Sequence, residues 1–259
     1  MSFEWWLVPV LVLAGTVAGV LNVLAGGGSL LTLPILIFAG LPGVTANGTN
    51  RVAILMQNLV AVWRFDRSGV MPWSLVSWAA APATVGSVVG ARLALLLDDQ
   101  QFQRVLAWIM IGVTLWTLAR GARRGSGAGA SGGLEAEDQV GRVNGWALAA
   151  GFFLVGVYGG FVQAGVGFLI LAALGLAGLD FVRGNAVKVF SVLCFTVVAL
   201  GVFAWQGAVH WWLGFALGVG NALGAVLGVR WTVLKGHVWL ERFVAVTVIV
   251  FAVALWVRS

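Results

Sequence analysis

Ala25-Gly26-Gly27-Gly28-Ser29, running on through Pro34 to Ala46-Asn47-Gly48-Thr49-Asn50-Arg51, is the stretch that decides the fold. It lies within an uncharged run of 46 residues from Trp5 to Asn50. As one straight helix this run would be about 70 Å long, whereas the hydrocarbon core of a bilayer is about 30 Å thick. The chain must therefore turn back inside the run. The three glycines are the predicted turning point, because glycine opens the backbone most readily.

An opened backbone at membrane depth has unpaired N–H and C=O groups, and lipid offers them no partners. Such a break persists where it is packed in protein or lines a wet cavity, so the stretch is a candidate solute site. The alternative is that Gly26, Gly27 and Gly28 only allow close helix packing. Polar side chains that follow the glycines favour the functional interpretation, because amides at membrane depth are costly unless paired or used. They are Asn47, Thr49, Asn50, Gln57 and Asn58.

Composition points to a membrane protein. Hydrophobic residues make up 61% of the 259-residue chain and charged residues only 9%, against about a quarter in soluble domains. We therefore expect an all-α polytopic membrane protein that keeps its first apolar segment. The net charge of +6 comes from basic residues that flank apolar segments, so we expect a lipid bilayer as partner and no nucleic acid. The single Cys194 and two isolated histidines predict no metal site and no cofactor.

Apolar and polar segments alternate in a pattern that predicts ten membrane segments, or eight if short ones are re-entrant. The predicted segments are 5–24, 28–41, 50–64, 71–96, 103–119, 143–160, 165–179, 187–206, 208–229 and 241–257. We expect residues 1–120 to form a first transmembrane repeat, 121–142 a flexible polar linker, and 143–259 a second repeat.

The two halves match at a constant offset of 138 residues. Asn47 pairs with Asn185 and Trp73 with Trp211, and three arginines of the first half also pair with arginines of the second: Arg92 with Arg230, Arg104 with Arg242 and Arg120 with Arg258. Glycines alone could coincide by chance, but these residue types in one ungapped register indicate an internal duplication. Internal repeats are common in secondary transporters.

Loop charge predicts that the second repeat is inverted. If each repeat crosses the membrane five times, 11 basic residues lie on the same side of the membrane as the linker, with Lys188 among them. The other side of the membrane then holds 4, with Arg51 among them. If each Gly-rich pair counts as one crossing, the repeats become parallel and the split is 7 to 8. The positive-inside rule favours the uneven split and a cytoplasmic linker.

Gly26-Gly27-Gly28 with Pro34 and the Ala-Asn-Gly-Thr-Asn sequence at 46–50 resemble the TauE/SafE sulfite exporter family. A weaker second copy reads Gly159-Gly160-Phe161-Val162-Gln163-Ala164-Gly165-Val166-Gly167-Phe168, followed by Gly184-Asn185-Ala186-Val187-Lys188. The resemblance covers nearly the whole chain. It implies an integral membrane transporter of organosulfonates, sulfite or related small sulfur anions, often in the export direction. The second copy departs from the first in having Gly165-Val166-Gly167 for three glycines and Ala172 for Pro34.

Helix N-termini carry partial positive charge, so segments that begin near Gly28 and Gly165 could hold an anion without a full cation. Side-chain donors and Lys188 could add to this site, although Lys188 could also be an ordinary cytoplasmic loop cation. Lys188 aligns with the uncharged Asn50 of the first half, so we expect a positive charge on only one side of the site. The predicted substrate-binding residues are Gly26, Gly27, Gly28, Asn47, Thr49, Asn50, Gln163, Gly165, Asn185 and Lys188.

No Ser/His/Asp arrangement or Gly-x4-Gly-Lys loop predicts an enzyme or an ATPase. We therefore expect a secondary transporter that acts as an exporter in the cell membrane. Its expected partners are a small anionic substrate and the lipid bilayer, and a homo-oligomer is one open arrangement. Two alternatives stay open: a passive anion channel, which would not saturate, and a non-transporting assembly partner, in which the buried amides would be dispensable.

Overall fold

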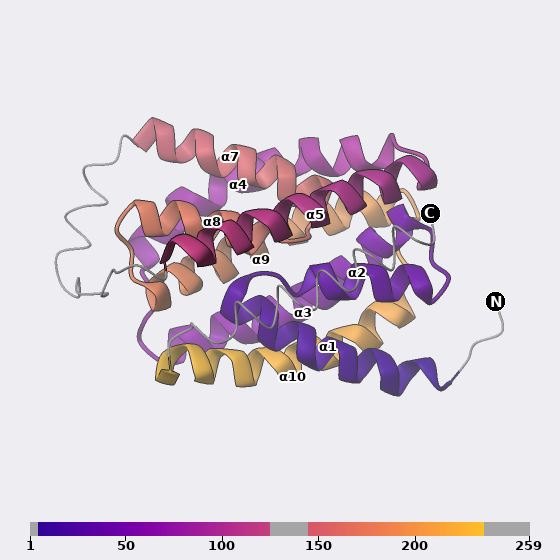
Figure 1. The fold of residues 1–259 in the computed structure, drawn as a ribbon, viewed down its shortest axis with the longest axis horizontal. Helices are drawn as coiled ribbons and strands as arrows, with labels where there is room; N and C mark the ends of the chain where they lie inside the picture. The colour runs from indigo at the N-terminus through magenta and orange to yellow at the C-terminus, as the bar shows by residue number, and fades with distance from the viewer. Residues whose placement is uncertain (1–4, 125–144, 236–259) are drawn as a thin grey trace.

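The computed structural model describes residues 5–124 and 145–235, and every regular element in these ranges is a helix (Figure 1). The helices are α1 (Leu7–Ala25), α2 (Ser29–Phe38), α3 (Gly43–Arg67), α4 (Trp73–Leu95), α5 (Asp99–Arg124), α7 (Gly145–Phe161), α8 (Val166–Leu176), α9 (Phe181–Trp205) and α10 (Trp211–Lys235). Four of them, α1, α4, α9 and α10, are long and apolar enough to cross a membrane. The predicted all-α polytopic membrane fold is confirmed.

Breaks separate α1 from α2 and α7 from α8, where the glycine-rich sequences predicted them. Gly26 ends α1 in the left-handed conformation, with φ of 83°, and its N–H donates to the carbonyl oxygens of Leu21 and Asn22. Gly165, with φ of 73°, precedes α8 in the same conformation. The α2 and α8 helices have only 10 and 11 residues, or about 15 Å of helix. They are half-helices, about half as long as a bilayer core is thick.

Corresponding helices begin at nearly constant spacing along the chain. The first residues of α1 and α7, of α3 and α9, and of α4 and α10 are each 138 residues apart, and those of α2 and α8 are 137 apart. In Figure 1, α1 begins and α2 ends at one end of the bundle, whereas α7 begins and α8 ends at the other. An inverted repeat requires this arrangement. Which end faces the cytoplasm stays a prediction.

The two halves interlock rather than form separate bundles. The α1 helix packs mainly against α10, and α7 packs mainly against α4, so the first helix of each half packs on the fourth helix of the other half. Glycines make these crossings close: a Cβ at Gly19 would collide with α10, and one at Gly90 would collide with α7. Small residues at these contacts let helices approach in the absence of a hydrophobic driving force. At the centre, α3 contacts α9.

Two predicted boundaries were wrong. The segments predicted at 50–64 and 187–206 begin earlier, at Gly43 and Phe181, so Asn47 and Asn185 lie within helices rather than before them, and Asn50 lies inside α3 rather than at its start. The α5 helix also runs to Arg124, four residues into the predicted linker. The rest of that linker, 125–142, and the last predicted segment, 241–257, lie outside the described residues.

Candidate anion-binding site

The two helix breaks meet at the centre of the bundle. Gly26, at the end of α1, lies against Gly167, in the first turn of α8, and a Cβ on either would collide with the backbone of the other. No other residue type fits this contact unless the two breaks separate. The breaks are therefore held together by backbone packing.

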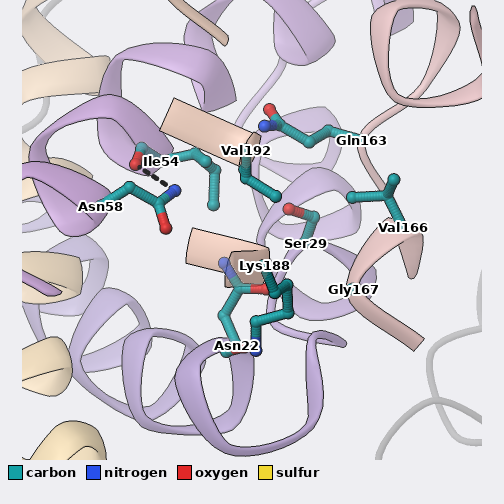
Figure 2. Close-up of a pocket in the computed structure, with 9 residues that line it drawn as sticks. All are labelled: Asn22, Ser29, Ile54, Asn58, Gln163, Val166, Gly167, Lys188 and Val192. Atoms are coloured by element: carbon teal, nitrogen blue, oxygen red, sulfur yellow. Dashed lines mark hydrogen bonds between the residues drawn. The ribbon is translucent and has the colours of Figure 1, made fainter. Parts of the chain in front are cut away.

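A small polar cavity lies beside this contact (Figure 2). Its volume is about 10 Å³, which is room for about one water molecule. The residues that line it come from α1, α2, α3, α8, α9 and the α7–α8 break. They are Asn22, Ser29, Ile54, Asn58, Gln163, Val166, Gly167, Lys188 and Val192.

The cavity lies where helices of the N-terminal half of the chain meet helices of the C-terminal half. Two pairs of its lining residues are 138 positions apart: Ser29 with Gly167, and Ile54 with Val192. A pseudo-two-fold relation between the repeats would place such pairs on opposite sides of one axis. In transporters built from inverted repeats, substrate sites lie at this kind of interface.

The N-terminal ends of both half-helices border the cavity. Ser29 is the first residue of α2, and Val166 and Gly167 are the first two residues of α8. Helix N-termini carry about half a positive elementary charge each and present N–H groups that lack helical partners. Two such ends on one cavity create an environment that favours a negative ligand.

Lys188 adds a full positive charge to the wall of the cavity. Its side chain is only 2% exposed. The ammonium donates to the carbonyl oxygens of Asn22 at 2.9 Å and Val23 at 2.7 Å, and to Oδ1 of Asn185 at 2.6 Å. Asn22 and Val23 belong to the last turn of α1, so the charge lies at the negative end of that helix. No carboxylate in the described ranges pairs with Lys188. The ion pair within those ranges joins Arg183 and Asp180, at the start of α9.

Arg51 forms a similar contact in the other half of the bundle. This arginine is fully buried. Its Nη1 donates to the carbonyl oxygen of Gly159 at 3.1 Å and its Nη2 to that of Gly160 at 2.5 Å, in the last turn of α7. The guanidinium also lies 4.7 Å from the ring centroid of Phe203. Sequence reasoning did not include Arg51 in the site.

Both cations were misassigned when loop charge was counted. Arg51 lies inside α3 and Lys188 inside α9, and both are buried. Neither is a loop residue, so the split becomes 10 to 3 rather than 11 to 4. The direction of the bias is unchanged. The interpretation of Lys188 as an ordinary loop cation was wrong.

The predicted polar residues do not form one cluster. Gln163 and Lys188 line the cavity, and Nε2 of Gln163 donates to Oγ1 of Thr196 at 2.5 Å. Asn50 braces the first turn of α2: its Nδ2 donates to Oγ of Ser29, and its Oδ1 accepts from Thr32.

Asn47, Thr49 and Asn185 hold backbone groups outside the cavity. Nδ2 of Asn47 donates to the carbonyl oxygen of Phe161, the last residue of α7. Oγ1 of Thr49 accepts from the backbone N–H of His210, and Asn185 donates to Phe181 of its own helix. Asn22, Ser29, Asn58 and Gly167 line the cavity but were not among the predicted substrate-binding residues. The sequence signal for Ser29 and Gly167 was their 138-residue pairing, and that for Asn58 was its place among the polar residues after the glycines.

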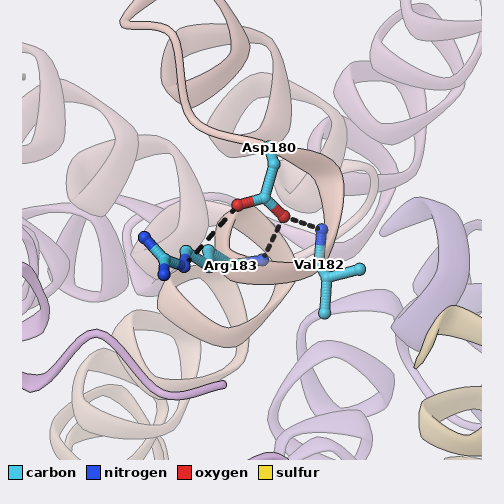
Figure 3. Close-up of polar contacts among 3 residues, drawn as sticks. All are labelled: Asp180, Val182 and Arg183. Carbon is cyan, nitrogen blue, oxygen red and sulfur yellow. Dashed lines mark hydrogen bonds and ion pairs between the residues drawn. The ribbon is translucent and has the colours of Figure 1, made fainter. Parts of the chain in front are cut away.

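The starts of α3 and α9 fix the position of these side chains. Asp180 caps α9, and its Oδ1 accepts from the backbone N–H groups of Val182 and Arg183 (Figure 3). The first N–H of α3, on Gly43, donates to a carboxylate oxygen of Asp99 at the start of α5. A carboxylate at a helix N-terminus stabilises the unpaired N–H groups there.

Comparison with known proteins agrees with this architecture. Residues 11–255 match the model of the family described as sulfite exporter TauE/SafE. The chain belongs to the TauE/SafE family. No solved structure matches this TauE/SafE protein.

Relatives of this TauE/SafE protein are named as membrane transporters. It is 28% identical to the probable membrane transporter protein ORF9 of Sinorhizobium sp over 96% of this chain and 92% of the relative. It is 29% identical to the probable membrane transporter protein YfcA of Escherichia coli K12, over 96% and 89% of the two chains. A probable membrane transporter protein of Xylella fastidiosa is 30% identical, over 94% and 91%.

Proposed function

We propose that this protein is a secondary transporter that exports small sulfur-containing anions, such as sulfite or organosulfonates, across the cell membrane. The observation that carries the proposal is the meeting of two half-helix N-termini, those of α2 and α8, at a cavity bordered by the ammonium of Lys188. Backbone N–H groups and one cation can hold an oxyanion without dedicated anion-binding side chains. The description of the family as sulfite exporters supports the choice of sulfur anion.

The cavity is too small for such an anion in this conformation, since its volume is about 10 Å³. Binding therefore requires the α2 and α8 ends to move apart, which separates Gly26 from Gly167. Asn50, Gln163 and Asn58 would then offer amide groups to the bound oxyanion, alongside Lys188. A closed resting site also favours a transporter that saturates over a permanently open anion channel.

Transport by purified full-length protein in proteoliposomes tests the proposal. We expect saturable efflux of radiolabelled sulfite, competition by methanesulfonate, and no competition by the neutral analogue dimethyl sulfone. Unlabelled sulfite outside the vesicles should accelerate efflux of the label, because a carrier returns faster when it is occupied. Efflux that rises linearly with concentration and shows no exchange would indicate the channel. Absence of sulfite flux, with intact exchange of another anion, would reject the substrate class.

A further inference from the structure

The two buried cations hold the two broken helices in the same way, each across the boundary between repeats. Arg51 on α3 donates to carbonyl oxygens in the last turn of α7, and Lys188 on α9 donates to those in the last turn of α1. We call these the Arg51 contact and the Lys188 contact. Neither cation has a carboxylate partner among the described residues. Each instead neutralises the negative end of a helix that stops inside the bundle.

The two contacts lie on opposite sides of the cavity along the bundle axis. Arg51 precedes the cavity residue Ile54 by three positions on α3, and Lys188 precedes Val192 by four on α9. Arg51 is therefore about one helical turn from the cavity, whereas Lys188 itself lines the cavity and lies one turn from Val192. The helices α3 and α9 run in opposite directions, because Arg51, near the start of α3, stacks on Phe203, near the end of α9. The two cations thus lie toward opposite ends of the bundle, each on the side where its own helix begins.

A buried aromatic ring accompanies each contact. Phe203 lies under the guanidinium of Arg51 and is fully buried. Its counterpart 138 residues earlier, Phe65, is also fully buried and belongs to one hydrophobic cluster with Val23, whose carbonyl oxygen accepts from Lys188. Each contact therefore combines a buried cation and the end of an interrupted helix with a buried phenylalanine nearby.

We propose that the Arg51 contact and the Lys188 contact are the two gates of the transporter and that they open one at a time. This inference rests on the proposed transport function. When α7 moves away from Arg51, the cavity opens toward the end of the bundle where α1 begins. When α1 moves away from Lys188, it opens toward the end where α7 begins. With both contacts formed, as in this structure, the cavity is closed on both sides.

The gates also explain why an anion would promote opening. A cation that leaves the carbonyl oxygens would stay buried and uncompensated, which is strongly unfavourable in a low-dielectric interior. An anion in the cavity would lie beside Lys188 and about one helical turn from Arg51, and would supply the missing charge. The empty protein would therefore remain closed, and the loaded protein would open at either end.

Sided chemical labelling tests this inference. Ser29→Cys places a thiol in the cavity wall, in a Cys194→Ser background, and an impermeant methanethiosulfonate reagent is added from one side of reconstituted vesicles. We expect Arg51→Gln to raise the labelling rate about tenfold only from the side where α1 begins, and Lys188→Gln only from the other side. Tenfold is the shift in a two-state equilibrium that loss of one charge-assisted hydrogen bond can produce.

Controls separate gating from simple loss of structure. Arg51→Lys keeps the charge and should keep labelling slow, and Arg67→Gln changes an exposed arginine of the same helix and should have no effect. If Arg51→Gln fails to insert, Phe203→Ala keeps the cation and should raise labelling from the same side. Equal acceleration from both sides, or none in either variant, would overturn the gates. Labelling needs no sulfite, so failure of sulfite transport alone would reject the proposed substrate and leave the gates standing.

Discussion

Gly26→Ala is the sharpest test of the central contact, because the structure separates its two costs. The first cost is conformational: at a φ of 83°, a residue with a Cβ loses about 1–2 kcal/mol. The second is steric, because the added Cβ would collide with the backbone of Gly167. Forcing such a group into a packed site typically costs about 1–3 kcal/mol. The free energy of unfolding should therefore fall by about 2–5 kcal/mol.

Gly69→Ala is the matched control. Gly69 has a similar left-handed φ of 66°, but an added Cβ there meets nothing within 4 Å. It should therefore lose only the conformational cost of about 1–2 kcal/mol. The difference between the two variants measures the contact between the helix breaks, free of the backbone effect.

The assay is thermal unfolding of both purified variants in one detergent, followed by sulfite efflux at matched protein levels. Gly26→Ala should unfold at a lower temperature than Gly69→Ala and should also change the rate of efflux, because the breaks cannot close fully. Gly69→Ala should transport normally. Equal unfolding temperatures for the two variants would show that the breaks do not pack against each other and that this contact does not hold the cavity closed.

Three further predictions follow from the site, the caps and the charges. Lys188→Gln should raise the half-saturation concentration for sulfite about tenfold, the loss expected for one charge-assisted contact, whereas Arg67→Gln at matched membrane levels should not. Asp180→Ala should lower the free energy of unfolding by about 1 kcal/mol through loss of the α9 cap, and Asp180→Asn should restore most of it, as thermal unfolding would reveal. Impermeant maleimide should label Ser126→Cys from the cytoplasm and Ser259→Cys from the opposite side in a cysteine-free background; labelling of both from one side would contradict the inverted repeat.

The sequence predicted the helix breaks because their cause is local. An uncharged run too long for one crossing must turn, and glycine is the residue that turns at least cost. The left-handed Gly26 and Gly165 are the result. Repeat spacing was also visible, since it needs only a comparison of the chain with itself.

The start of α3 was mispredicted because its amides resemble a polar loop. Asn47, Thr49 and Asn50 each form a hydrogen bond with a group distant in the sequence: the carbonyl oxygen of Phe161, the N–H of His210 and the hydroxyl of Ser29. These partners become known only when the fold is known. With partners available, the amides are compatible with a buried helix.

Comparison of the two repeats by position also concealed the second cation. Lys188 aligns with Asn50, and Arg51 aligns with Val189, so residue pairing indicated a charge on one side of the site only and did not reveal the buried Arg51 in the other half. On a helix, positions 50 and 51 differ by about 100° of rotation, and a long arginine side chain can span that difference. Arg51 therefore reaches the end of α7 much as Lys188 reaches the end of α1. In both halves a buried cation lies at the end of the interrupted helix. The negative end of the helix requires a positive charge nearby, and either of two adjacent positions on the facing helix can supply it.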